Sequence, residues 1–86
     1  MAVEPLDYDG PVPVWRQLAD RIRADIESGK ILPGRAVPSK RTLCEVHGVS
    51  GPTVDKVMSQ LKAEGLIKPV RGLGLFVTRL EERGQG

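Results

Sequence analysis

The stretch SKRTLCEVHGVSGPTVDKVMSQLKAE, residues 39–64, decides the fold. Ser39 and Ser50 each stand directly before a segment in which apolar residues recur with helical spacing. A serine in that position accepts a hydrogen bond from an amide of the first helical turn and so favours helix initiation. We therefore expect one helix from Lys40 to about His47 and a longer one from Gly51 to about Glu64.

A turn of three residues, His47-Gly48-Val49, separates these two segments. Glycine readily adopts the left-handed conformation that closes a helix, so Gly48 can end the first helix and redirect the chain. The side chains expected to face inward are Leu43 and Val46 in the first helix and Val54, Val57, Met58 and Leu61 in the second. Two helices joined by a short turn that contains glycine form a helix-turn-helix.

A further helix is expected upstream, from Val14 to Ser28. It has proline before its first turn and glycine directly after its last, an arrangement typical of helix boundaries. Its apolar stripe consists of Trp15, Leu18, Ile22 and Ile26. Residues 30–38 contain a Pro-Gly turn signal and then a short apolar pair, which together predict a loop followed by a brief strand.

Downstream of residue 65 the pattern changes from helical spacing to two short apolar runs, residues 66–71 and 75–79. A turn with two glycines, residues 72–74, lies between them, so this segment is expected to form a β-hairpin. Phe76 in the second strand and Trp15 in the first helix are expected to pack in the core rather than to stack on nucleotide bases.

The length of 86 residues predicts one domain with one core and leaves no room for a second, ligand-sensing domain. We expect an acidic leader over residues 1–12, the folded domain over 13–79 and a flexible tail over 80–86. Met1 and the leader favour a naturally short protein over an excised domain. Because the leader is acidic, the rest of the chain is more basic than the formal net charge of +2, which is compatible with nucleic-acid binding.

Catalysis and metal binding have little support in the composition. Cys44 is the only cysteine and His47 the only histidine, so neither an intramolecular disulfide nor a structural zinc site is expected. These two side chains lack a third group to orient them, and we expect no enzyme activity and no cofactor. The N-terminus has no apolar secretory segment and no stretch is long enough to span a membrane, which predicts a cytoplasmic protein.

Several short motifs occur in a characteristic order and spacing. They are PVWRQLA (13–19), IESGK (26–30), LPGR (32–35), VPSKRTL (37–43), GVS (48–50), LKAEGLI (61–67) and GLG (72–74). In these motifs residues 13–77 resemble the N-terminal DNA-binding domain of GntR-type bacterial regulators, without the effector domain that normally follows it. The resemblance implies a winged helix-turn-helix fold, mainly α with a small β-hairpin. It also implies a sequence-specific transcription regulator whose third helix enters the major groove of double-stranded DNA while the glycine-turn wing lies near the minor groove.

The resemblance implies three DNA-contacting regions. The first precedes and begins the second helix, where cations and helix N-terminal amides suit phosphate; the second begins the third helix, and the third is the turn of the wing. They consist of Arg35, Ser39, Lys40 and Arg41; of Ser50, Gly51, Pro52, Thr53 and Lys56; and of Arg71, Gly72, Leu73 and Gly74.

Three positions depart from the family pattern. Gly51 and Asp55 stand where the family usually has arginines, which can make two hydrogen bonds to guanine, whereas Asp55 can only accept one from a cytosine amino group. Leu73 stands where a basic or small polar residue is common in the wing. We therefore expect a weaker or unusually specified DNA interaction, made by a monomer or a weak homodimer. The alternative is a protein-interaction module in which the third helix or the wing docks on a protein partner.

Overall fold

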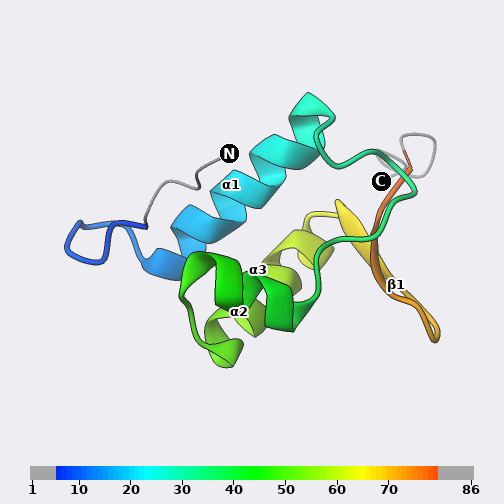
Figure 1. Ribbon diagram of the computed structural model, residues 1–86. Coiled ribbons are helices and arrows are strands. Elements are labelled where there is room, and N and C mark those ends of the chain that lie inside the picture. The colour runs from blue at the N-terminus through cyan, green and yellow to red at the C-terminus, as the bar shows by residue number, and fades with distance from the viewer. Residues whose placement is uncertain (1–5, 80–86) are drawn as a thin grey trace.

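The structure is a computed structural model that describes residues 6–79; the predicted tail at 80–86 and residues 1–5 of the predicted leader lie outside this range. Within residues 6–79, three helices are followed by a two-stranded antiparallel hairpin (Figure 1). The elements are α1 (Val14–Ser28), α2 (Lys40–His47), α3 (Gly51–Ala63), β1 (Ile67–Val70) and β2 (Gly74–Val77). The expected winged helix-turn-helix class is confirmed. None of the helices in the described range is long and apolar enough to cross a membrane.

Serine caps and a glycine turn build the helix-turn-helix. The Ser39 hydroxyl accepts a hydrogen bond from the Thr42 amide at 3.1 Å at the start of α2. The Ser50 hydroxyl accepts one from the Thr53 amide at 3.3 Å at the start of α3. Between the helices Gly48 has a φ of 66°, in the left-handed region, and its amide donates back into α2. A side chain would strain the backbone at this φ, so glycine is what allows so short a turn.

Replacing Ser50 by alanine is expected to lower the free energy of unfolding by about 1 kcal/mol, because the capped amide of α3 loses its partner. Urea denaturation of the two proteins measures the difference. Ser59→Ala is the matched control, since Ser59 is exposed within α3 and alanine favours a helix interior. Equal losses of stability in the two variants would contradict the capping role of Ser50.

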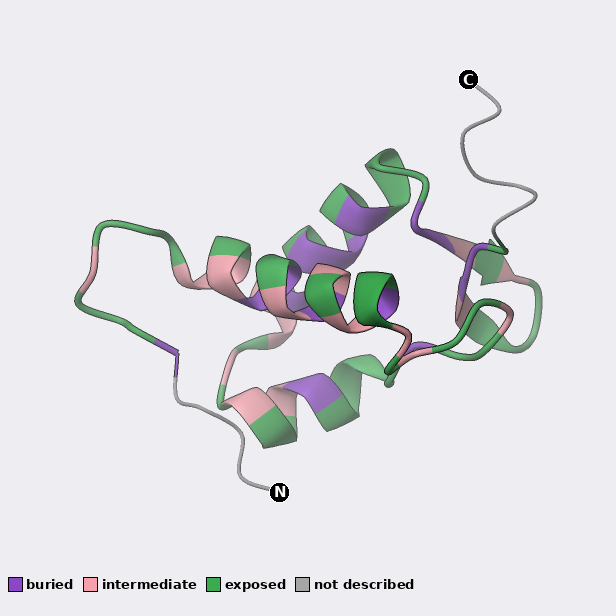
Figure 2. Cartoon of the chain, turned by 90° about the horizontal axis from the view of Figure 1, so that it is seen from above, coloured by how far each residue is buried: buried purple, intermediate pink, exposed green. Residues whose placement is uncertain are grey.

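The core forms where α1 packs against α3, which also contacts α2 and β1. Buried stretches of the helices face the interior and exposed stretches line the outside of the molecule (Figure 2). The large side chains that are fully buried are Leu18, Val54, Val57, Leu61 and Val77. Four of them belong to the apolar stripes predicted for α1 and α3, so helical spacing identified the centre of the core.

The prediction that Val46 faces inward is wrong, because 51% of this residue is exposed. Leu43 is buried as expected, and Cys44 and His47 are half-buried on the same side of α2. With about 100° of rotation per residue, a face centred on these three positions turns the side chain at 46 toward solvent. A helix of only two turns has one contact face, and its neighbours decide which residues form it.

The N-terminal leader contributes to the core, which sequence analysis did not anticipate. Leu6 is only 7% exposed and belongs to the main core cluster. The Asp7 amide donates to the Gln17 side chain at 2.8 Å, and that side chain donates to the Asp7 carbonyl at 2.7 Å. The Tyr8 hydroxyl donates to the Gly48 carbonyl at 2.9 Å. This segment therefore ties α1 to the turn between α2 and α3.

The hairpin is continued by one bridge from the segment before α2. The brief strand expected there is a single antiparallel bridge between Ala36 and Phe76. Side chains alternate along a strand, so Leu75 and Val77 share the side that packs on the core, while Phe76 between them points to the other side. Phe76 is half-buried and is not part of the core cluster, so the prediction that it packs in the core is wrong. Its two neighbours, Leu75 and Val77, pack there instead.

Candidate nucleic-acid interface

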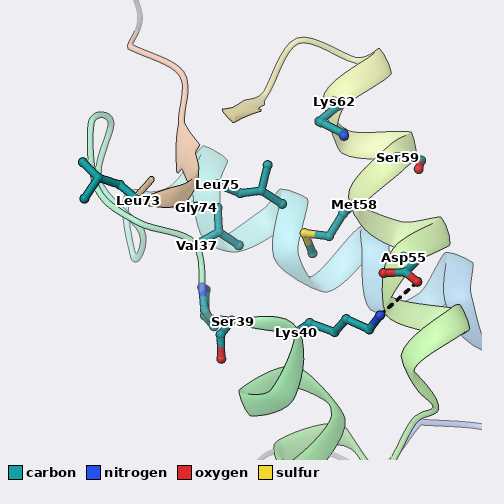
Figure 3. A pocket seen from close by; sticks show the side chains of 11 residues that line it. Val37, Ser39, Lys40, Asp55, Met58, Ser59, Lys62, Leu73, Gly74 and Leu75 are labelled. Carbon is teal, nitrogen blue, oxygen red and sulfur yellow. Dashed lines mark hydrogen bonds and ion pairs between the residues drawn. The ribbon is translucent and has the colours of Figure 1, made fainter. Parts of the chain in front are cut away.

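A groove of about 550 Å³ lies between the start of α2, the exposed side of α3 and the turn between β1 and β2 (Figure 3). Four residues predicted to contact DNA line it, namely Ser39 and Lys40 at the start of α2 and Leu73 and Gly74 at the wing. Asp55 lines it from α3. The fold thus brings two of the three predicted regions onto one concave surface together with the third helix.

Sequence reasoning missed Met58, Ser59 and Lys62, which line the same groove from α3. Asp55, Ser59 and Lys62 are spaced by four and three residues, so they lie along one face of the helix (Figure 3). The helical spacing that predicts the buried stripe also identifies this polar stripe, when it is applied to the exposed positions. Lys62 adds a cation that the predicted site lacked.

Lys40 crosses from α2 to α3 and forms an ion pair with Asp55, as Figure 3 shows. The distance from Lys40 Nζ to Asp55 Oδ2 is 3.1 Å. The lysine therefore reduces the repulsion that an isolated Asp55 carboxylate would exert on a phosphate backbone. Both side chains are more than half exposed, so the pair lies at the surface and in contact with water.

The start of α3 offers few polar side-chain groups beyond its own capping interactions. The Ser50 and Thr53 hydroxyl oxygens are 2.9 Å apart and hydrogen-bonded to each other. Pro52 is exposed and has no polar side chain, and Gly51 is half-buried. Helix capping therefore accounts for Ser50 and Thr53 without any nucleic acid.

Three further predicted cations, Arg35, Arg41 and Arg71, are exposed and are not part of the groove lining within residues 6–79. Arg41 pairs with Glu45 one turn along α2, with 3.5 Å between Nε and Oε2. An exposed pair of this kind contributes little to stability, so its guanidinium can exchange the carboxylate for a phosphate at small cost. Arg71 directly follows β1 at the turn of the wing.

Lys56 points toward α1 instead of the groove. Its Nζ lies 4.7 Å from the centre of the Trp15 ring, a cation–π contact. Trp15 is half-buried and packs against the core, as sequence analysis expected. An exposed contact of this kind is worth about 0.5–1 kcal/mol, which is small enough for Lys56 to leave it for a phosphate.

The turn of the wing depends on two glycines. Gly72 and Gly74 have φ values of 78° and 106°, a region that side chains disfavour. The Leu73 amide between them donates to the Val70 carbonyl at 2.9 Å and closes the turn. Leu73 itself is 70% exposed, so the wing presents an apolar tip.

His47, at the end of α2, is a described group whose ordinary pKa lies near neutrality and is shifted by the fold. Burial lowers its pKa from the ordinary value near 6.5, the positive charge of Arg21 lowers it further, and Asp25 opposes the shift. Its Nδ1 atom is buried without a hydrogen-bond partner among the described residues. The folded protein therefore favours the neutral imidazole.

Acidification is expected to destabilise the wild type more than a His47→Gln variant. Because the folded protein holds the pKa of His47 below its unfolded value, the unfolded chain binds a proton first as the pH falls. The stabilisation from the neutral imidazole is present above about pH 6.5 and is lost below it. Urea denaturation of both proteins measures this difference, at pH values between about 8 and about 5 in steps of about one pH unit. A constant difference across the range would contradict the prediction.

Comparison with known proteins gives one family. The model of the gntR family of bacterial regulatory proteins matches residues 15–77. The transcriptional repressor NagR of Bacillus subtilis is 31% identical over 83 residues, covering 94% of this chain and 34% of NagR. MngR of Escherichia coli, a mannosyl-D-glycerate transport/metabolism system repressor, is 39% identical over 74 residues, covering 86% of this chain and 30% of MngR. The chain thus spans about a third of the length of these relatives.

Solved structures show the same similarity. The crystal structure of AraR(DBD) in complex with operator ORX1 has a TM-score of 0.76 and 32% identity, covering 88% of this chain and 100% of that chain. YtrA from Sulfolobus acidocaldarius, a GntR-family transcription factor, has a TM-score of 0.77 and 34% identity, covering 85% of this chain and 77% of YtrA. The first of these neighbours is a DNA-binding domain on its operator.

Proposed function

Because the chain belongs to the GntR family of bacterial regulatory proteins, we propose that it binds double-stranded DNA sequence-specifically and regulates transcription. On this proposal α3 enters the major groove and the turn between β1 and β2 approaches the minor groove. The observation that supports it is the groove, because the start of α2, the outer face of α3 and the wing turn line one surface.

The proposed contacts divide by chemistry. Cations beside the α2 start and at the wing are assigned to phosphate, since such contacts position a protein without specifying sequence. They are Arg35, Arg41 and Arg71, with Lys62 on α3 added from the structure. Lys40 is also a proposed DNA contact, and its pairing with Asp55 directs its ammonium group to the groove side of α3. Most of the remaining predicted residues lie at helix starts or in the wing, where backbone amides, small side chains and the exposed Leu73 permit a close approach to the DNA. They are Ser39, Ser50, Gly51, Pro52, Thr53, Gly72, Leu73 and Gly74, while the ammonium group of Lys56 is assigned to phosphate.

A two-dimensional NMR titration with a mixed-sequence duplex tests the proposal. Amides in residues 39–41, 51–56 and 71–74 are expected to shift, while those in the second half of α1 stay in place as an internal control. The affinity should fall by orders of magnitude between about 50 mM and about 200 mM salt, because phosphate contacts release counterions. If no amide shifts at low salt, the DNA proposal fails and a protein partner for α3 and the wing takes its place.

We further propose that the chain acts in the bacterial cytoplasm and binds DNA as a monomer or a weak homodimer. Operators of two-fold symmetric readers contain two half-sites about one helical turn apart. Sedimentation of the protein alone and with a duplex that carries one or two selected sites measures the stoichiometry. Stable dimers in the absence of DNA would contradict this part of the proposal.

A further inference from the structure

We propose that Lys40 and Asp55 act as one unit that recognises a G·C base pair in the major groove, an inference that rests on the proposed DNA-binding function. The unit joins a donor from α2 to an acceptor from α3. In this role the two residues would supply the base recognition that α3 lacks at position 51.

The side chain of Lys40 occupies the space that a side chain at position 51 would need. A Cβ on Gly51 would lie 2.9 Å from Cε of Lys40, closer than unbonded carbon atoms approach each other. The lysine chain passes close over the first turn of α3, and a side chain at position 51 would require the flexible end of the lysine to shift. Its Nζ then reaches Asp55 one turn further along the helix, at 3.1 Å from Oδ2. Glycine at 51 and aspartate at 55 are thus parts of one arrangement.

The pair is accessible to a ligand. The side chains of Lys40 and Asp55 are 56% and 61% exposed. They lie on the groove side of α3, the side proposed to face the major groove (Figure 3). An exposed ion pair of this kind is weak in water, so Lys40 can donate and Asp55 can accept new hydrogen bonds without a large loss.

The chemistry of the pair matches the major-groove edge of one base pair. Guanine presents the acceptors O6 and N7 there, and cytosine presents the N4 amino donor. Guanine O6 and cytosine N4 are neighbours, since they are hydrogen-bonded to each other across the pair. The Lys40 ammonium can donate to guanine while the adjacent Asp55 carboxylate accepts from cytosine. A T·A pair presents an acceptor and a donor in the same order, but it has the thymine methyl group where guanine has N7, and adenine N7 lies beside the donor, where it repels a carboxylate. It therefore offers the lysine one acceptor instead of two and fits the pair less well.

The ion pair also reduces the electrostatic repulsion between the Asp55 carboxylate and the DNA phosphates. A lone carboxylate near phosphates would weaken binding to every sequence. With Lys40 beside it the pair adds no net charge, so Asp55 can accept a hydrogen bond from cytosine with less repulsion from the DNA backbone.

To test this inference, bound duplexes are selected from a randomised library. The affinity is then measured for each base pair at every position of the selected site. The wild type is expected to prefer G·C at one position, and Asp55→Ala and Lys40→Ala should each reduce that preference by about tenfold. Asp55→Asn should move the preference toward A·T, because an asparagine amide can pair with adenine. Gly51→Ala, which displaces the lysine chain, should weaken the same preference while the helix remains intact.

Matched controls separate base recognition from general effects of charge and fold. Asp20→Asn removes the acid of an ion pair on α1, and Lys30→Ala removes an exposed lysine after α1. Both should leave base preferences unchanged, and circular dichroism checks that every variant is folded. If the Lys40 and Asp55 variants change affinity equally for all sequences, the pair only connects α2 to α3 and the inference is overturned. If the folded wild type binds no duplex at low salt, the proposed function itself fails.

Discussion

Replacing Arg41 and Arg71 together by alanine is expected to lower the affinity for duplex DNA by about a hundredfold at about 0.1 M salt. Both arginines are exposed, Arg41 on α2 and Arg71 at the wing turn, so they belong to two elements that border the groove although neither side chain lines it. Each phosphate contact releases about 0.9 counterions, which is worth about tenfold at this salt concentration. Fluorescence anisotropy with a labelled duplex measures the loss of affinity. Repeating it over a range of salt concentrations measures the number of counterions released.

The dependence on salt distinguishes phosphate contacts from a folding defect. The slope of log K against log salt should become shallower by about two units in the double variant, and by about one in each single variant. The weakening should be similar for all sequences, because phosphate carries no base identity. Lys30→Ala combined with Arg79→Ala is the charge-matched control, since these residues follow α1 and β2 away from the wing turn. An equal loss in the control would refute the assignment.

Replacing Leu61 by alanine is expected to lower the free energy of unfolding by about 2–5 kcal/mol. Leu61 is fully buried on the inner stripe of α3, so its truncation removes apolar contacts and leaves a cavity that the core can fill only in part. A domain of this size has about 5–15 kcal/mol of stability in total, and each lost kcal/mol lowers the Tm by about 4–8 °C. Thermal and urea denaturation measure the change, and a large part of the variant should be unfolded at elevated growth temperatures.

The same substitution at Leu73 is the control for burial. Leu73 is 70% exposed at the turn of the wing, so Leu73→Ala should change the stability by no more than about 0.5 kcal/mol. If the two variants lose similar stability, the hairpin turn is part of the cooperative core and the role assigned to Leu61 is wrong. Leu73→Ala is also informative on DNA, since it tests the apolar tip without disturbing the fold.

Gly51 and Asp55, the two residues of α3 that depart from the family pattern, are unrelated in the sequence but adjoin the same lysine side chain in the structure. By sequence, Gly51 and Asp55 are two separate losses of an arginine, each of which weakens the expected DNA interface. In the structure a single side chain, Lys40, connects them by crossing above Gly51 to Asp55. A cation from α2 thereby neutralises the acid on α3, and the surface proposed to face DNA carries a lysine–aspartate pair without net charge.

The sequence by itself determined the elements whose stability depends on near neighbours. Ser39 and Ser50 cap helices through amides three residues away, and Gly48 closes α2 through one left-handed residue. Helical spacing likewise identified the stripes that contain Leu18 and Leu61. Such interactions act within about one helical turn, so a local pattern contains the information needed to predict them.

Only the tertiary structure decided which side chains meet across the chain. Leu6 enters the core, Lys56 turns to Trp15, and Val46 faces solvent although it lies one turn from Leu43. Lys40 and Asp55 also belong to different helices, and the angle set by the turn between them brings the two charges together. The physical reason is that burial and charge pairing depend on how packed helices are oriented, and that orientation is a property of the whole core rather than of any local segment.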